Sequence, residues 1–183
     1  MKLSLRRFVS EIDTKRPFDC GDADLNDFLV DTSSCTPNAT MYAKELLATT
    51  YVLEDKESGR NLAYFSILND KVDREYTDPT IWNSLSRMIP NAKRRSAYPA
   101  LKIGRLAVCV EMKGLDLGSH ILRFIEKLFA FQPIAGCRFI TVDAYNSAVG
   151  FYQKCNFKCL EQQGPDDSTR LMYFDLKRIT PHP

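Results

Sequence analysis

One segment constrains the fold more than any other: an apolar strand, a glycine-containing turn and an amphipathic helix follow one another. Residues 100–110 (ALKIGRLAVCV) end in a continuously apolar run, which is typical of a central strand covered on both faces. Ser119 to Phe131 repeats apolar residues with a helical period, and the turn before it carries Gly114 and Gly118. Such a turn presents unpaired backbone N–H groups and the positive end of a helix dipole, which together bind phosphate. Two glycines alone are weak evidence, and an ordinary turn is the alternative interpretation.

The rest of the chain predicts further strands and helices. Residues of high strand propensity, bounded by turn residues, predict strands over 3–12, 45–54, 61–68, 137–144, 158–161 and 171–176. Apolar residues at helical spacing predict helices over 22–29, 81–88 and 147–154. The order of these elements predicts an α/β protein with a mixed central sheet flanked by helices.

Length and composition favour one globular domain over residues 1–183, in which the more polar residues 70–98 form an insertion between strands. The formal charge of +2 gives no general electrostatic argument for nucleic acid. With two histidines, His120 and His182, and no CxxC pair among six cysteines, we expect reduced thiols and no metal site. No apolar run reaches the roughly 20 residues that cross a bilayer, and the first residues lack a signal-peptide core, so we expect a cytoplasmic protein without a membrane partner.

Two regions together carry a resemblance to a known family. The first region is residues 103–108 (IGRLAV) with 113–118 (KGLDLG), and the second is residues 142–146 (VDAYN) with 151–157 (FYQKCNF). They resemble the GNAT superfamily of acetyl-coenzyme A-dependent N-acetyltransferases. The first is similar to the coenzyme A strand of that family and its Q/R-x-x-G-x-G/A pyrophosphate loop, and the second to its A-x-N and F-Y-x-K-x-G-F region. The resemblance implies the GNAT fold and acetyl-coenzyme A as cosubstrate.

A third segment resembles one branch of the superfamily. Residues 17–21 (PFDCG) with 25–29 (LNDFL) look like the amino-terminal signature of the branch that includes the acetyltransferase toxins of toxin–antitoxin modules. Three residues depart from the family pattern: Lys113 replaces Gln or Arg, and Asp116 and Asn156 each replace a glycine. The Asp116 carboxylate is expected to repel a pyrophosphate by about 1 kcal/mol or more, unless it turns to solvent or meets Lys113. Asn156 is a mild change because Asn tolerates the left-handed backbone.

The resemblance also implies site residues. It assigns cofactor binding to Leu106, Ala107, Val108, Lys113, Gly114, Leu115, Asp116, Leu117, Gly118, Ser119, Asn146 and Tyr152. It places the acetyl carbonyl against backbone N–H groups of Leu106 to Val108 and the pantetheine arm near Asn146. Tyr152 aligns with the general acid, because a phenol can protonate the departing thiolate. The alternatives are that Tyr152 is a core aromatic and that Asn146 is a turn residue.

The acceptor remains open at the level of sequence. Glu45, Glu111 and Asp143 are all candidates for the base that deprotonates the amine, none is fixed by spacing, and water is a fourth candidate. The acceptor is a small amine, a protein amine or the amino group of an aminoacyl-tRNA, and a degenerate GNAT-fold binding module without turnover is the rival hypothesis. By analogy with other GNAT proteins, we also expect a possible homodimer.

One basic cluster bears on the RNA hypothesis. Lys93, Arg94 and Arg95 are adjacent, and Lys102 and Arg105 follow nearby. These residues could contact an RNA acceptor or the 3′-phosphate of the cofactor. A solvated loop is the alternative, because adjacent cations without interleaved aromatic residues carry little specificity.

Overall fold

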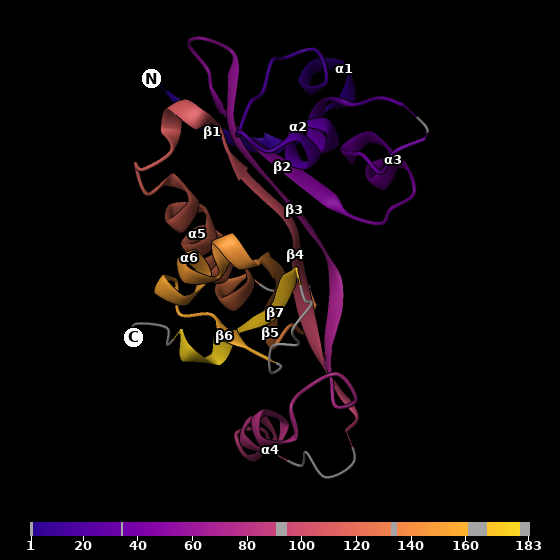
Figure 1. Cartoon of the computed structure of the whole chain (residues 1–183), viewed down its shortest axis with the longest axis vertical. Coiled ribbons are helices and arrows are strands. Elements are labelled where there is room, and N and C mark those ends of the chain that lie inside the picture. The colour runs from indigo at the N-terminus through magenta and orange to yellow at the C-terminus, as the bar shows by residue number, and fades with distance from the viewer. Residues whose placement is uncertain (1, 34, 91–94, 133–134, 161–167, 180–183) are drawn as a thin grey trace. The chain divides into compact units, whose positions relative to one another are not determined.

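A mixed sheet runs through the chain in the strand order β1-β2-β3-β4-β5-β7-β6 (Figure 1). The computed structural model describes residues 2–33, 35–90, 95–132, 135–160 and 168–179. Its strands are β1 Leu3–Arg7, β2 Thr49–Asp55, β3 Arg60–Asp73, β4 Ala97–Val108, β5 Phe139–Tyr145, β6 Lys158–Cys159 and β7 Thr169–Asp175. Its α-helices are α1 Ser10–Asp13, α2 Ala23–Val30, α3 Ala39–Lys44, α4 Pro79–Arg87, α5 Leu117–Phe131 and α6 Val149–Lys154. Short 3-10 helices are η2 Val110–Met112, η3 Asn146–Ala148 and η4 Leu176–Arg178.

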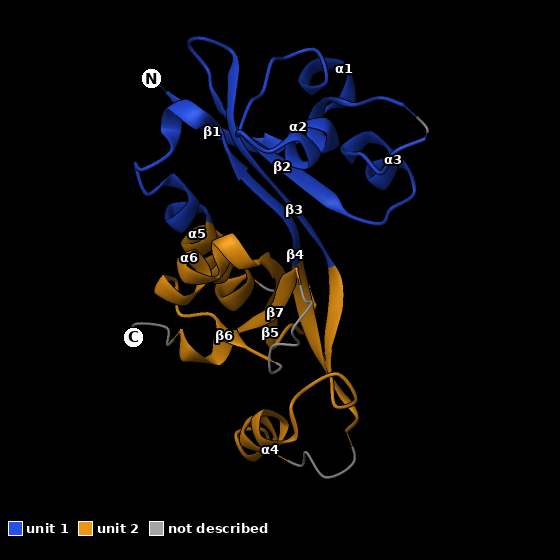
Figure 2. Cartoon of the chain, in the orientation of Figure 1, with its two compact units in different colours: residues 1–68, 103–121 blue, residues 69–102, 122–183 orange. Residues whose placement is uncertain are grey.

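The chain divides into two compact units (Figure 2). Unit 1 contains Met1–Leu68 and Ile103–Ile121, and unit 2 contains Asn69–Lys102 and Leu122–Pro183. Strands β3 and β4 each contribute residues to both units. The expectation of a single domain over residues 1–183 stays a prediction.

In unit 1, antiparallel strands carry the amino-terminal helices. Strand β1 pairs with β2 from Leu3 opposite Asp55 to Arg7 opposite Tyr51, and β2 pairs antiparallel with β3. Helices α2 and α3 pack on each other, and α3 packs on β2 (Figure 1). The buried core of unit 1 comprises Phe18, Cys20, Phe28, Leu29, Ala39, Val52, Leu62, Tyr64, Ala107 and Cys109. This core joins the amino-terminal turn and helices to the end of β4.

Unit 2 is built around β5. Strand β4 pairs parallel with β5 from Ala100 opposite Phe139 to Lys102 opposite Thr141, and β5 pairs antiparallel with β7. A buried cluster includes Val72, Trp82, Leu85, Tyr98, Ala100, Phe139, Leu160 and Tyr173. Helix α4 is therefore part of this core, because it supplies Trp82 and Leu85. None of the helices in the described ranges is long and apolar enough to cross a membrane.

The structure confirms the expected helices to within a few residues and corrects several strands. Strand β1 ends at Arg7, before the predicted residue 12, because residues 10–13 form α1. Strand β2 starts at Thr49, after a turn in which Leu46 has φ +55°, whereas a start at residue 45 was predicted. Strand β3 continues to Asp73, so residues 70–98 include the end of β3, helix α4 and the start of β4.

Two smaller differences concern helix α3 and the carboxyl-terminal strands. Helix α3 was not predicted from the sequence, although Asn38 caps it by accepting a hydrogen bond from the Met41 N–H at 2.9 Å. Strand β6 covers Lys158–Cys159, and the predicted end of this strand at Glu161 lies outside the described residues.

Candidate functional site

The turn that links β4 to α5 lies in unit 1. Leu106, Ala107 and Val108 end strand β4, and the Cys109 N–H then donates to the Leu62 carbonyl at 2.8 Å. The chain continues through η2 and through the turn residues 113–116 before α5 begins. Leu115 in this turn is exposed, whereas Leu117, Gly118 and Ser119 form the first turn of α5 and are half-buried. The expected order of strand, turn and helix is confirmed.

Two residues of this turn have a left-handed backbone. Gly114 has φ +80° and Asp116 has φ +55°. A Cβ built on Gly114 would meet no atom within 4 Å, so the conformation and not crowding favours glycine there. Asp116 occupies a backbone position that suits glycine, and Asp is one of the few other residues that adopt it. The glycine in the family pattern therefore has a conformational reason that Asp116 satisfies.

The beginning of α5 presents backbone donors. The Asp116 carbonyl accepts the His120 N–H at 3.0 Å and lies 2.8 Å from Nδ1 of the same residue. Hydrogen bonding within the helix thus starts at the Asp116 carbonyl, so the N–H groups of Leu117 and Gly118 have no acceptor within the helix. A helix of 15 residues adds the positive end of its dipole. Amide donors at the start of a helix, with open space over Gly114, are groups that can bind a phosphate.

The charged side chains of the turn point to different surroundings. Asp116 is exposed to solvent. The Lys113 ammonium lies beside the amino-terminal turn, where a Cβ built on Gly21 would be 3.5 Å from Nζ. Lys113 also lowers the pKa of the Asp19 carboxyl, which is depressed chiefly by hydrogen bonds from Gly21 N–H and Asn26. Lys113 is therefore oriented toward residues 17–21 and does not pair with Asp116. The exposure of Asp116 to solvent weakens the repulsion that its carboxylate would exert on a phosphate.

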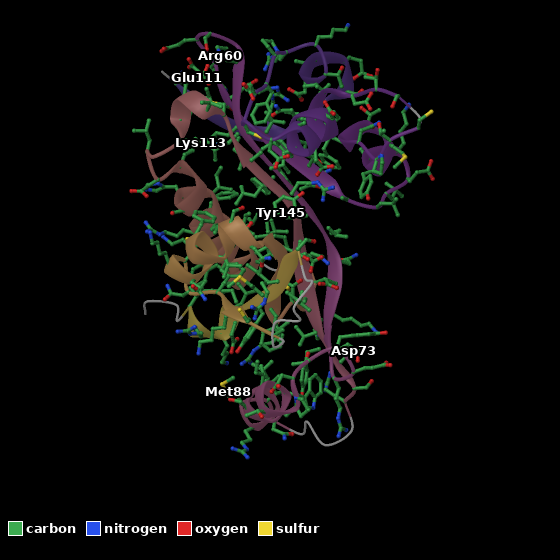
Figure 3. All side chains as sticks on the ribbon, in the orientation of Figure 1. Arg60, Asp73, Met88, Glu111, Lys113 and Tyr145 are labelled. Atoms are coloured by element: carbon green, nitrogen blue, oxygen red, sulfur yellow. The ribbon has the colours of Figure 1, made fainter. Side chains whose placement is uncertain are left out.

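The amino-terminal signature packs directly on the segment before the turn. The Val110 N–H donates to the Asp19 carbonyl at 2.9 Å. Asp19 Oδ1 accepts the Gly21 N–H at 2.7 Å, and Asn26 Oδ1 accepts the Cys20 N–H at 2.8 Å. Figure 3 labels Glu111 and Lys113, which lie in and directly after η2 in unit 1. Two of the three segments that carry the family resemblance thus meet within unit 1.

Tyr152 lies in α6, within unit 2. Its ring makes edge-on contacts with Phe151, at a centroid distance of 5.1 Å, and with Phe157, at 5.4 Å. Burial raises the pKa of the phenol well above its usual value, and Cys155 adds to the rise. The phenol therefore keeps its proton at neutral pH, as a general acid must, although a core aromatic would have the same surroundings.

The other two residues of the second resembling region show turn geometry. Asn156 has φ +65°, which confirms that it occupies a left-handed position suited to glycine. Asn146 is exposed and begins η3 directly after β5. Asn146 and Tyr152 belong to unit 2, whereas the turn at residues 113–119 belongs to unit 1.

The three candidate bases differ in their partners. Glu111 accepts a hydrogen bond from Arg60 Nη2 at 2.6 Å, and this bond lowers the pKa of the carboxyl to about 2. Asp143 pairs with Lys102 Nζ at 2.5 Å. Glu45 is exposed at the end of α3. Glu111 is thereby a poor base at neutral pH, because its conjugate acid is too strong.

The described residues of the basic cluster are partly neutralised. Arg105 lies 3.4 Å from Asp24 Oδ2 and stacks over the Phe28 ring at 5.3 Å, while Lys102 pairs with Asp143. Arg95 is exposed, and Lys93 and Arg94 lie outside the described residues.

Two polar residues of interest were missed by the sequence analysis. Glu126 in α5 is only 9% exposed, and burial raises the pKa of its carboxyl to about 7. Asn61 at the start of β3 is 2% exposed. The burial of Glu126 could have been suspected from the sequence, because it is a lone acid within an apolar helix. Nothing in the local pattern distinguishes Asn61 from a turn residue.

Comparison with known proteins identifies the fold. No family model and no curated protein matches the sequence. The solved structures that match include a tyrosine-to-phenylalanine mutant of KacT, at 20% identity over 98% of both chains with a TM-score of 0.76. They also include AtaT complexed with acetyl-methionyl-tRNAfMet, at 21% identity over 97% of both chains with a TM-score of 0.75. AtaTR bound with AcCoA matches at 19% identity, over 97% of this chain and 96% of that chain, with a TM-score of 0.70.

These neighbours define the class of structure. The chain has the GNAT fold, with a mixed sheet flanked by helices. Its neighbours KacT and AtaT are GNAT-fold acetyltransferase toxins of toxin–antitoxin modules. At about one-fifth identity the likeness establishes the fold, which agrees with the resemblance found in the sequence.

Proposed function

We propose that this protein transfers an acetyl group from acetyl-coenzyme A to a primary amine by direct attack. The observation that carries the proposal is the left-handed turn at Gly114 and Asp116, which leads into the N-terminus of α5. This geometry suits a diphosphate bound by backbone amides. The likeness to AtaTR bound with AcCoA supports the same cosubstrate. Acetyl-coenzyme A, when bound, supplies the thioester that the amine attacks.

Backbone groups are proposed to hold the cosubstrate. The N–H groups of Leu117 and Gly118 would bind the diphosphate, and Lys113 lies at the edge of the same turn. The N–H groups of Leu106 to Val108 would bind the acetyl carbonyl, which is the polarising interaction that acyl transfer needs. The register of β4 with β5 covers Ala100 to Lys102, which leaves the later residues of β4 outside that register.

Tyr152 is proposed to act as the general acid that protonates the departing thiolate. Its burial keeps the phenol neutral, so the proton is present over the whole physiological range. Proton transfer from the phenol to the thiolate is unfavourable, because the pKa of an ordinary phenol is about 1.5 units above that of a thiol, a cost of roughly 2 kcal/mol. Burial raises the pKa of the Tyr152 phenol further and adds to this cost. We therefore infer that Tyr152 donates its proton late in the breaking of the carbon–sulfur bond, when negative charge has built up on the sulfur. Water is proposed to accept the proton of the amine, because the hydrogen bond from Arg60 lowers the pKa of Glu111 to about 2 and makes this carboxylate a weak base.

A second, more specific proposal is that the acceptor is the amino group of an aminoacyl-tRNA. The likeness to AtaT complexed with acetyl-methionyl-tRNAfMet supports it, as does the amino-terminal signature that packs under the turn. Arg95 belongs to the basic cluster and is exposed, so an RNA could contact it. The third alternative is a binding module without turnover, for which the Asp116 carboxylate is the argument.

An acceptor screen with two matched tyrosine variants tests the proposal. Acetyl-coenzyme A consumption is measured with a polyamine, a peptide with a free N-terminus and methionyl initiator tRNA. The Tyr152→Phe variant should lower kcat by at least about 100-fold, a typical contribution of a general acid, while the Kd for acetyl-coenzyme A stays unchanged. Tyr76→Phe, at an exposed tyrosine of unit 2, is the control and should retain full activity. Tight cosubstrate binding without consumption for any acceptor would favour the binding module.

A further inference from the structure

Helix α6 ends shortly after Tyr152, in a turn that bonds back to this residue. The Phe157 N–H donates to the Tyr152 carbonyl at 3.0 Å, and the Asn156 N–H donates to the Gln153 carbonyl at 2.9 Å. Two such bonds around a left-handed residue define the Schellman motif, which ends many helices. Asn156 supplies the left-handed conformation with its φ of +65°. The main chain therefore ties Phe157, which lies beyond α6, to Tyr152 within it.

The rings of the same two residues are also in contact. The Tyr152 ring meets the Phe157 ring edge-on, at a centroid distance of 5.4 Å and an interplanar angle of 67°. Phe157 in turn packs on Phe174 of β7 at a centroid distance of 5.6 Å, and both phenylalanines are buried. An edge-on pair of aromatic rings is a directional contact as well as apolar burial. Phe157 thus links the ring of Tyr152 to the central sheet.

The direction of the Tyr152 phenol depends on packing around its ring. In the part of the chain that the structure describes, the hydroxyl makes no hydrogen bond, and burial and Cys155 are the causes that raise its pKa. Phe151 also contacts the ring, but it is the preceding residue of the same short helix and moves with it. Phe157 is anchored on β7 instead. Phe157 is therefore the aromatic contact that fixes the ring relative to the sheet.

Asn156 takes part in this arrangement through its backbone. Its side chain is exposed, so it adds no atom to the core around Tyr152. A residue at this position must adopt a φ near +65° if Phe157 is to keep its place. Glycine adopts this conformation freely and Asn tolerates it, whereas a β-branched residue is strained there. A substitution of Asn156 can therefore disturb the turn while the buried side chains stay unchanged.

We propose that Phe157, placed by the left-handed turn at Asn156, is a positioning residue for the phenol of Tyr152. It keeps the hydroxyl in one direction, as proton donation to a departing sulfur requires. A general acid acts only within hydrogen-bond reach of the atom that it protonates, and a misplacement of about 1 Å can cost about 100-fold in rate. This inference rests on the proposed role of Tyr152 as general acid.

The placement of the ring is tested first, by NMR of the full chain labelled with ring-13C tyrosine. The Tyr152 signal is assigned by its loss in Tyr152→Phe. Asn156→Val strains the turn and should move this signal, because the ring current of Phe157 acts on it. The matched variant Asn156→Gly should leave the signal in place, and the other tyrosines should be unchanged in both variants. A Tyr152 signal that stays in place in Asn156→Val, or moves equally in both variants, would overturn the inference whether or not an acceptor is known.

Kinetics with the acceptor found in the screen then show whether Phe157 acts through Tyr152. Phe157→Leu should lower kcat by at least about tenfold and leave the Kd for acetyl-coenzyme A unchanged. Phe139→Leu removes a ring from the other buried cluster of unit 2 and should keep the kcat of the parent protein. In the Tyr152→Phe background, Phe157→Leu should cost nothing further, because its effect passes through the phenol.

The outcomes separate this inference from the proposed function. Full kcat in Tyr152→Phe would refute the general acid itself. A loss of kcat in Tyr152→Phe without a loss in Phe157→Leu would contradict the positioning role alone. An equal loss from Phe157→Leu in both backgrounds would also overturn it, because Phe157 would then act on the core and not through the phenol.

Discussion

At the residue scale, the proposed binding of the cosubstrate depends most on Asp116. Its φ of +55° shows that the backbone adopts the glycine-like conformation without a glycine. The carboxylate nevertheless adds a negative charge at the start of α5, where a phosphate is proposed to lie. Its exposure to solvent reduces the repulsion, because water screens charges more effectively than protein does.

Replacing Asp116 separates the effect of charge from that of conformation. Asp116→Asn removes the charge and keeps a residue that tolerates a left-handed backbone, while Asp116→Gly also removes the side chain. Relief of about 1 kcal/mol of repulsion should tighten acetyl-coenzyme A binding about fivefold in both variants. Calorimetric titration measures the two Kd values. An unchanged affinity in both would show that the Asp116 carboxylate does not face the bound diphosphate.

At the scale of elements, α5 carries a buried acid that is expected to make stability depend on pH. Burial raises the pKa of Glu126 from 4.5 to about 7, and Arg123 opposes this rise. The folded protein therefore binds a proton more tightly than the unfolded chain does between these pH values. Stability contributed by the protonated form is complete below about pH 4.5 and is lost as pH rises toward 7.

Glu126→Gln should remove this dependence. The variant should exceed the parent in unfolding free energy by roughly 1 kcal/mol at pH 8, a value reduced for partial solvent screening. At pH 4 the two proteins should differ little. Urea unfolding at both pH values measures the difference. A parent protein that is more stable than the variant at pH 8 would show that the Glu126 carboxylate has a stabilising partner.

Helix α1 depends on one buried carboxylate. Asp13 is fully buried, accepts the Val9 N–H at 2.7 Å and pairs with Arg6 Nη2 at 2.7 Å. Asp13→Ala leaves the guanidinium and the amide without this partner and should lower the unfolding free energy by about 3 kcal/mol. Asp27→Ala, at an exposed residue of α2, should change it by less than about 0.5 kcal/mol. Equal effects in urea unfolding would refute the role of the buried pair.

Much of the whole molecule follows from sequence patterns, because strand and helix periodicity is a local property. The α/β class, helix α5 and the turn at Gly114 could each be predicted from neighbouring residues. The end of β1 could not be predicted, because it depends on the pairing of Asp13 with Arg6, which requires the folded turn. The burial of Asn61 beside Arg16 could not be predicted either, because these two residues lie far apart in the sequence. Contacts that form only in the folded chain thus decided what the local pattern left open.

At the scale of the whole molecule, the fold agrees with the family resemblance, while the proposed activity depends on one complex, that of the protein with acetyl-coenzyme A. Titration of acetyl-coenzyme A into the full chain by calorimetry tests that complex most directly. We predict one site with micromolar affinity, and a much weaker one in Gly114→Val, because a β-branched residue is strained at φ +80°. Absence of binding to the parent protein at millimolar acetyl-coenzyme A would contradict the proposed activity and leave a GNAT-fold protein with another ligand.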